Sequence, residues 1–236
     1  MTTHDLAIGY AKPLISNINL TLPKNSMTCL VGVNGAGKTT FLRTLAGLQR
    51  PLSGYVEIDG KAIASLNPSQ LSRLVSVVLT DKVADSLITV YELVAMGRMP
   101  YTGFLGRLSD NDNHIVNDAI ARLGIENISD CRLQEVSDGQ RQRAFIARAL
   151  AQQTRIIILD EPTAFLDFRS RAEVMELLRG LAHNDGKSVL LSTHELDLAK
   201  RFGDCFWEME EGAIFTVQPS AQSLADSPSS WFRGIR

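Results

Sequence analysis

One glycine-rich segment constrains the fold more than any other part of this sequence. Residues 32–39 read GVNGAGKT and fit the pattern G-x-x-x-x-G-K-[ST]. The segment follows a compact apolar run at 27–31, which predicts a strand, and precedes a helix expected over 39–48. Between a strand and a helix, the glycines let the backbone curl so that its N–H groups point inward. This context favours a phosphate-binding loop over a plain glycine-rich turn.

The residues of this loop predict their own contacts with a phosphate group. Successive N–H groups and the positive end of the following helix make a cradle for phosphate oxygens. Lys38 can reach the β and γ phosphates, and the Thr39 hydroxyl is placed to bind Mg²⁺. The residues expected to contact nucleotide here are Asn34, Gly35, Ala36, Gly37, Lys38, Thr39 and Thr40.

An acidic pair marks the end of a second predicted strand. Residues 156–159 are aliphatic throughout, as in a buried parallel strand, and Asp160 and Glu161 follow directly. Ligands of open α/β sheets bind at the carboxyl ends of strands, so Asp160 would lie beside the phosphate loop and suit Mg²⁺. Glu161 could polarise a water for attack on the γ phosphate. The alternative is an acidic pair that merely begins a loop.

Periodicity predicts an α/β chain with a helical interruption. Alternation before residue 31 predicts short antiparallel strands. Helical patterns follow over 90–96, 110–123 and 139–151, and the second places Asp112, Asp118 and Arg122 opposite an apolar stripe. The α/β pattern then resumes, with strands expected at 156–159 and 188–192 and helices expected at 169–182 and 195–202.

Composition excludes several classes of protein. A chain of 236 residues with 44% hydrophobic and 21% charged residues is typical of a globular protein. It contains no apolar run approaching the roughly 20 residues of a membrane span. A net charge of -2 argues against a strongly basic nucleic-acid binder, and the start lacks a secretory signal, so we expect a cytoplasmic location and no nucleic-acid partner. Cys29, Cys131 and Cys205 match neither a disulfide framework nor a zinc site.

Further motifs follow in a fixed order along the chain. These are VSDGQ at 136–140, DEP at 160–162, AFLD at 164–167 and His194. Together with the phosphate loop they resemble the ATP-binding subunits of ABC transporters over nearly the whole chain. The resemblance implies a RecA-like P-loop NTPase core (1–82 and 152–219) with an N-terminal antiparallel β subdomain. It also implies an inserted helical subdomain (83–151) and a C-terminal tail (220–236).

The resemblance implies roles for single residues, each with a plainer alternative. Tyr10 would stack on adenine, or pack as a strand tyrosine. His194 would contact the γ phosphate, or be structural. Asp167 would contact the opposite protomer, or cap the helix that follows it.

A head-to-tail homodimer is implied as well, in which the signature motif of one copy, VSDGQ at 136–140, covers the ATP of the other. Ser137, Gly139 and Gln140 begin a predicted helix, where free N–H groups favour an anion. A simple helix cap is compatible with the same residues.

Two positions depart from the family pattern. Thr80 stands where the family usually has a glutamine that contacts Mg²⁺ and the attacking water, and its hydroxyl is the expected replacement ligand. Asp138 stands where the signature usually has its first glycine. We expect its side chain to turn outward and cap the helix, because a carboxylate aimed at the triphosphate would repel it.

Within the family, residues 88–101 most resemble importers of iron-siderophore complexes, haem or cobalamin. The expected function is hydrolysis of ATP with Mg²⁺ to energise such an importer. The expected partners are a second copy of the chain, integral membrane permease subunits at the inner face of the membrane and, indirectly, a substrate-binding protein. The alternatives are an exporter subunit, a soluble ABC-type ATPase and a nucleotide-binding module without turnover.

Overall fold

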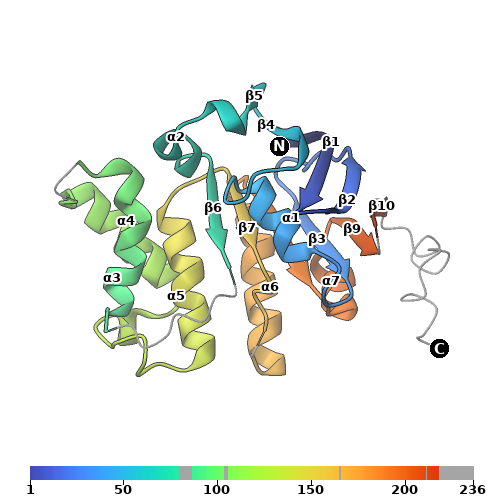
Figure 1. The fold of residues 1–236 in the computed structure, drawn as a ribbon. Helices are drawn as coiled ribbons and strands as arrows, with labels where there is room; N and C mark the ends of the chain where they lie inside the picture. Colours follow the sequence, from blue (N-terminus) through green and yellow to red (C-terminus); the bar gives the residue numbers. More distant parts are fainter. Residues whose placement is uncertain (80–86, 104–105, 165, 211, 218–236) are drawn as a thin grey trace.

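Two β-sheets organise the protein. The computed structural model describes residues 1–79, 87–103, 106–164, 166–210 and 212–217. Within these residues the central sheet has the strand order β10-β9-β3-β8-β7-β6, and a smaller sheet has the order β2-β1-β4-β5 (Figure 1). The expected tail at 220–236 lies outside the described residues.

The central sheet is parallel except at one edge, where β10 runs antiparallel to β9. Its inner strands are apolar and buried on both faces, as parallel strands require. The parallel strands therefore end at one common edge. The strands are β3 (Met27–Gly32), β6 (Val75–Val78), β7 (Ile156–Leu159), β8 (Ser188–Thr193), β9 (Cys205–Glu210) and β10 (Ala213–Val217).

Alternate residues of the central strands supply two hydrophobic clusters, one on each face. On one face, Leu30 and Ile158 pack with helix α1 and the small antiparallel sheet. On the other, Cys29 and Ile157 pack with α6 and α7. The elements are β1 (Thr2–Gly9), β2 (Pro13–Ile18), α1 (Lys38–Leu45), β4 (Ser53–Ile58), β5 (Lys61–Ala62), η1 (Ile63–Ser65), α2 (Pro68–Ser72), α6 (Phe168–His183) and α7 (Leu196–Phe202).

A group of helices lies beside the β6 edge of the central sheet (Figure 1). Its apolar residues join the same cluster as those of α6 and α7. The division of the chain at residues 82 and 151 stays a prediction. The helices are α3 (Val90–Ala95), η2 (Met96–Tyr101), α4 (Asp110–Arg122), η3 (Glu126–Ile128) and α5 (Asp138–Ala151).

The helix expected over 39–48 is shorter than the pattern predicts. It ends at Leu45, and Gly47 follows with a φ of 72°, a left-handed conformation that terminates helices and favours glycine. Leu48 is consequently 62% exposed and does not share the buried face of Phe41 and Leu42.

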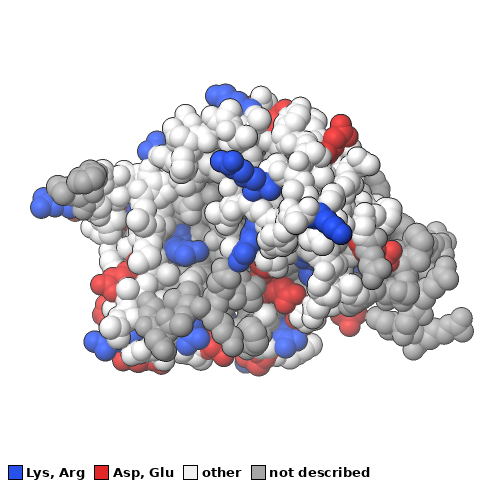
Figure 2. Space-filling model, viewed as in Figure 1, with Lys and Arg blue, Asp and Glu red and all other residues white. Residues whose placement is uncertain are grey.

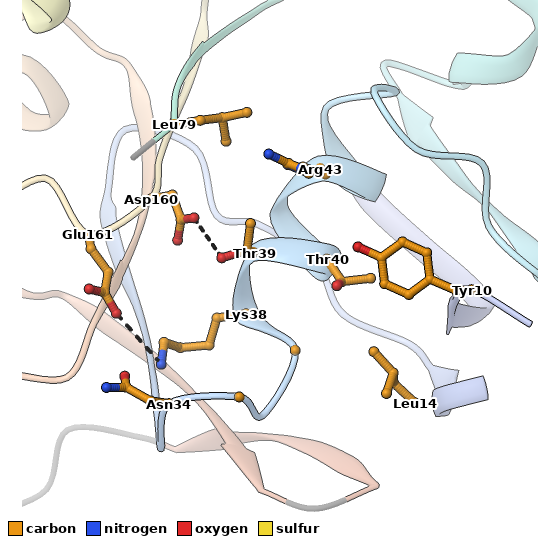
Figure 3. Close-up of a pocket in the computed structure, with 12 residues that line it drawn as sticks. Tyr10, Leu14, Asn34, Lys38, Thr39, Thr40, Arg43, Leu79, Asp160 and Glu161 are labelled. Carbon is orange, nitrogen blue, oxygen red and sulfur yellow. Dashed lines mark hydrogen bonds and ion pairs between the residues drawn. The ribbon is translucent and has the colours of Figure 1, made fainter. Parts of the chain in front are cut away.

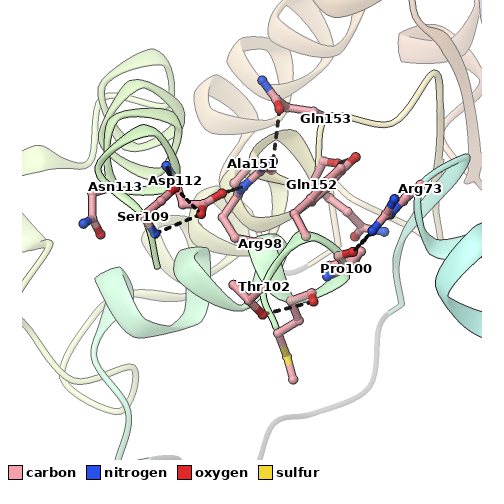
Figure 4. A network of polar contacts seen from close by, with 12 residues as sticks. Arg73, Arg98, Pro100, Thr102, Ser109, Asp112, Asn113, Ala151, Gln152 and Gln153 are labelled. Carbon is pink, nitrogen blue, oxygen red and sulfur yellow. Dashed lines mark hydrogen bonds and ion pairs between the residues drawn. The ribbon is translucent and has the colours of Figure 1, made fainter. Parts of the chain in front are cut away.

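Asp112 lies in the interior, contrary to its predicted place on the polar face of its helix. Its Oδ1 accepts a hydrogen bond of 2.9 Å from Arg98 Nε, and its Oδ2 accepts one of 2.6 Å from the Ser109 hydroxyl (Figure 4). Ser109 caps α4 and Asp112 completes the capping box, which turns the carboxylate back towards the helix start. Arg98 is also buried and donates to the Ala151 carbonyl, so the pair joins η2, α4 and the end of α5.

Candidate nucleotide site

A pocket of about 630 Å³ opens at the edge where the parallel strands end. The loop after β3, the first turns of α1 and the residues after β7 converge on it (Figure 3). Its lining consists of Tyr10, Leu14, Asn34, Gly35, Gly37, Lys38, Thr39, Thr40, Arg43, Leu79, Asp160 and Glu161.

The glycine-rich loop has the backbone that its sequence predicts. Gly35 and Gly37 have φ values of 84° and 107°, which side chains other than glycine rarely adopt. Gly37 is the N-cap of α1 and offers no side-chain hydrogen bond to the helix. The first turn of α1 therefore presents N–H groups for which an anion is a natural partner. This cradle fits the phosphates of a nucleotide.

Lys38 lies inside the curled loop. Its Nζ donates to the carbonyls of Gly32 and Val33 at 2.8 and 3.1 Å, and lies 3.9 Å from Glu161 Oε1. Burial lowers the pKa of Lys38 from its ordinary value of 10.5, while the charges of Glu161 and Asp160 oppose that shift. The loop thus carries a buried cation beside two carboxylates.

Asp160 and Thr39 meet across the pocket. The Thr39 hydroxyl donates to Asp160 Oδ2 at 2.7 Å. Hydroxyl and carboxylate oxygens are ligands that Mg²⁺ accepts, and in phosphate sites it takes few protein ligands beside phosphate and water. These two side-chain oxygens are therefore suitable ligands for a magnesium ion. The third expected ligand, Thr80, lies outside the described residues.

Glu161 adopts an unusual backbone conformation that directs its side chain into the pocket. Its φ is 45°, in the left-handed region that non-glycine residues seldom occupy. Its Oε1 lies 3.5 Å from His194 Nδ1 as well as near Lys38. The structure thus brings together the side chains that the sequence nominated for catalysis.

Tyr10 and Thr40 line the pocket as expected, and three further residues accompany them. Tyr10 is 69% exposed, so its alternative as a packed strand tyrosine is wrong. Ala36 instead packs against the cluster under the small sheet. Sequence reasoning missed Leu14, Arg43 and Leu79. For Arg43 a signal was present, because it follows Thr39 by four residues and so shares its helix face.

The signature residues begin α5 and are not among the residues that line the pocket. Ser137 and Gln140 form a capping box: Ser137 Oγ accepts from Gln140 N at 3.2 Å, and Gln140 Oε1 accepts from Ser137 N at 3.0 Å. The expectation that Asp138 caps this helix is wrong. Its carboxylate does turn outward, where Arg141 Nη1 donates to it at 2.8 Å.

Asp167 caps α6, as its plainer alternative states. Its Oδ1 accepts from the N–H groups of Arg169 and Ser170, each at 3.0 Å, and its Oδ2 accepts from the Ser170 hydroxyl. These contacts satisfy orphan N–H groups at the helix start.

A comparison with family models decides the identity of this fold and site. The model described as ABC transporter matches residues 15–164, which include the phosphate loop, the start of α5 and both acids after β7. The chain belongs to the ABC transporter family. The resemblance found in the sequence is thereby confirmed, and with it the expectation that the chain is an ATPase that binds nucleotide.

Curated members of the ABC transporter family match most of the chain. It is 38% identical over 228 residues to the achromobactin transport ATP-binding protein CbrD of Dickeya dadantii, covering 96% of this chain and 85% of that protein. It is 35% identical over 215 residues to the iron(3+)-hydroxamate import ATP-binding protein FhuC of Bacillus subtilis, covering 91% and 80%. It is 36% identical over 210 residues to the ferric enterobactin transport ATP-binding protein FepC of Escherichia coli, covering 89% and 78%.

Solved ABC transporter structures confirm the expected fold class. The dimeric structure of the bacterial ABC transporter cassette MJ0796 matches with a TM-score of 0.82 at 26% identity, covering 93% of this chain and 99% of that one. CbiO1 of Clostridium perfringens matches with a TM-score of 0.79 at 28% identity, covering 91% and 86%. In the described part of this ABC transporter chain, no helix is both long and apolar enough to cross a bilayer.

Proposed function

We propose that this protein hydrolyses Mg²⁺-ATP to energise a membrane importer of an iron-siderophore complex. The observation that carries the proposal is that Lys38 and Glu161 line one pocket with the Thr39–Asp160 pair, while His194 lies against the Glu161 carboxylate. The relatives named for achromobactin, iron(3+)-hydroxamate and ferric enterobactin support iron-siderophore complexes as the cargo.

The residues of the pocket divide the chemistry among them. The loop N–H groups and Lys38 hold the phosphates, and Tyr10 at the exposed rim stacks on adenine. Thr39 and Asp160 would hold Mg²⁺, which neutralises developing charge on the phosphates. Glu161 orients and deprotonates the attacking water. His194 contacts the γ phosphate from the end of β8.

A second copy of the chain completes each site in this proposal. The pocket has no lining from the signature residues, so one side of a bound nucleotide stays uncovered by this copy. The start of α5 would present the Ser137 hydroxyl and the Gly139 N–H to the nucleotide of a partner arranged head to tail. The N–H groups of Ser137 and Gln140 are already used within the capping box. The dimeric structure of MJ0796, which shares this fold, supports such an assembly.

The permease partner would dock in an apolar groove of about 1240 Å³. Leu48 and Leu71 line it from the core side, and Phe145 and Arg148 line it from α5. Figure 2 views the protein from the same side as Figure 1 and shows basic side chains, in blue, across the middle of this face. A short amphipathic cytoplasmic segment of the permease, with an acidic residue for Arg148, fits this lining. The chain would thus sit peripherally on the inner face of the membrane, with the substrate-binding protein reached through the permease.

The decisive experiment replaces the proposed base. Glu161→Gln should still bind ATP but lose turnover, because an amide cannot take the proton of the water. It should also accumulate as an ATP-bound dimer. Phosphate release and light scattering measure both effects. Glu126→Gln serves as the control, because Glu126 is exposed on η3 and is not among the residues that line the pocket. Hydrolysis by Glu161→Gln at the wild-type rate would refute the proposed role.

The cargo needs an experiment on the complete transporter. We expect the permease subunits to copurify with this chain, and ferric siderophore with its binding protein to stimulate ATP hydrolysis in reconstituted vesicles. Stimulation by lipids or drugs without a binding protein would indicate export instead. Absence of a membrane partner would favour a soluble ABC-type ATPase.

A further inference from the structure

A buried serine lies behind the two acidic residues of the pocket. Ser192 stands near the carboxyl end of β8, which lies between β3 and β7 in the central sheet. It is 0% exposed. Its hydroxyl donates to Asp160 Oδ1 at 2.6 Å and accepts from the backbone N–H of Glu161 at 2.9 Å. One hydroxyl therefore contacts two consecutive residues of the site.

The contact with Asp160 fixes how that carboxylate is turned. Its Oδ1 is held by Ser192 from behind, while its Oδ2 faces Thr39 in the pocket. Hydrogen bonds to an ionised carboxylate are short and stronger than those between neutral groups. Without the Ser192 hydroxyl, the carboxylate could rotate away from the direction that faces Thr39.

The contact with Glu161 restrains a strained backbone. A left-handed φ of 45° persists in a non-glycine residue only when its surroundings hold it there. The Ser192 hydroxyl accepts the N–H of this residue and so anchors the turn at which the chain leaves β7. The direction of the Glu161 carboxylate, towards Lys38 and His194, depends on that turn.

We propose that Ser192 is a positioning residue for ATP hydrolysis. It sets the orientation of the magnesium-facing carboxylate of Asp160 and the backbone of Glu161 together, through a single hydroxyl. The inference rests on the proposed roles of these two acids. Ser192 acts only through Asp160 and Glu161, and contacts neither the nucleotide nor the attacking water. Its removal therefore affects turnover and metal affinity, and leaves metal-free nucleotide binding unchanged.

The test compares Ser192→Ala with a matched loss of a buried hydroxyl elsewhere in the same sheet. Ser76 in β6 is also 0% exposed, and its hydroxyl meets Thr154 rather than a pocket residue. Ser192→Ala should lower kcat roughly tenfold to a hundredfold, as expected for losing a hydrogen bond to a charged group. The Mg²⁺ concentration for half-maximal activity should rise. Ser76→Ala should keep both parameters near the wild type.

Binding measurements separate positioning from a general loss of structure. Calorimetry in EDTA should give Ser192→Ala an ATP affinity within roughly threefold of the wild type, because the phosphate loop is untouched. Ser192→Thr, which retains the hydroxyl, should restore much of kcat. If Ser192→Ala unfolds, Ser192→Cys replaces it in the test. Its thiol is similar in size to the hydroxyl but is a weak hydrogen-bond donor, so kcat should fall by less than is expected for the alanine variant.

Two results would overturn the proposal. One is a Ser192→Ala or Ser192→Cys enzyme with wild-type kcat and Mg²⁺ dependence. The other is an equal fall of kcat in Ser76→Ala, which would indicate a structural effect only. A wild-type chain that neither binds nor hydrolyses ATP would instead refute the proposed function.

Discussion

The Asp112 carboxylate both completes the capping box of α4 and pairs with the buried Arg98. Hydrogen bonds from the Ser109 side chain and backbone lower its pKa from 3.8 to about 2, and Arg98 acts in the same direction, while burial opposes the shift. The ionised form is therefore favoured in the folded protein relative to the unfolded chain. A lowered pKa of this kind stabilises the fold above the ordinary pKa, and the contribution is lost as the pH falls through the folded value.

This linkage predicts the pH dependence of an Asp112→Asn variant. At pH 6 the variant should unfold at a lower urea concentration than the wild type, because a buried arginine loses its ionic partner. The difference should shrink as the pH falls from about 4 towards 2, where Asp112 of the folded wild type becomes protonated. Asp118→Asn, on the exposed face of the same helix, is the control. A difference that stays constant over this range would contradict the assignment.

Lys38 permits a second prediction at the scale of one residue. Lys38→Ala should weaken ATP binding roughly a hundredfold, because the ammonium group is the cation that the loop offers to the β and γ phosphates. Titration calorimetry measures the effect, with the exposed Lys61→Ala as the control. Wild-type affinity in Lys38→Ala would exclude this pocket as the ATP site.

At the scale of elements, the sequence predicted the parts of the fold that depend on local patterns. Strand β7 is a continuous aliphatic run, β8 has an apolar centre flanked by serine and threonine residues, and the glycine-rich segment predicts the loop before α1. What it missed depends on how side chains pair, which the apolar pattern does not predict. Asp138 pairs with Arg141 one turn along the same helix while Ser137 takes the cap, and Arg98 on η2 draws Asp112 inward. Ser192 carries no motif, and its contacts depend on β8 lying beside β7.

The packing of η2 against α5 supplies a prediction about these elements. A Cβ on Gly97 would lie 2.4 Å from the backbone oxygen of Arg148 and 3.1 Å from the Cβ of Ala151. Gly97→Ala should therefore destabilise the protein by about 1–3 kcal/mol, because two backbone segments must separate. Urea unfolding measures the change. Gly103→Ala, where a Cβ meets nothing within 4 Å, should be nearly neutral, and equal stabilities of the two variants would refute the packing argument.

At the scale of the whole molecule, Arg73 links the segment after α2 to the helical group. Its Nε and Nη2 donate to the Pro100 carbonyl at 3.0 and 2.8 Å (Figure 4). Its guanidinium also lies over the Tyr101 ring. Tyr101 is in turn held against the residue that follows α5, because its hydroxyl donates to the Gln152 carbonyl at 3.0 Å. The two parts of the chain that line the groove are thus joined by side chains as well as by the connecting backbone.

Breaking this link should loosen one part of the molecule and leave the rest unchanged. Arg73→Ala should speed amide hydrogen exchange in Met96–Tyr101, while β3 and β8 keep their protection. Arg73→Lys should rescue little, since an ammonium group cannot reproduce the two parallel donors. The exposed Arg155→Ala is the control. Unchanged exchange in η2 would show that the link contributes nothing to this packing.

The hydrogen bond between Thr39 and Asp160 joins residues 121 positions apart in the sequence. The segments that form the pocket therefore meet only after a large loop has closed and the parallel strands have paired, which are slow events in folding. A partly folded chain cannot assemble both sides of the pocket. ATP consequently acts as a ligand for the completed fold, and its concentration shifts the unfolding equilibrium in favour of the native state. Newly synthesised chains are in this way stabilised by the nucleotide that they will later consume.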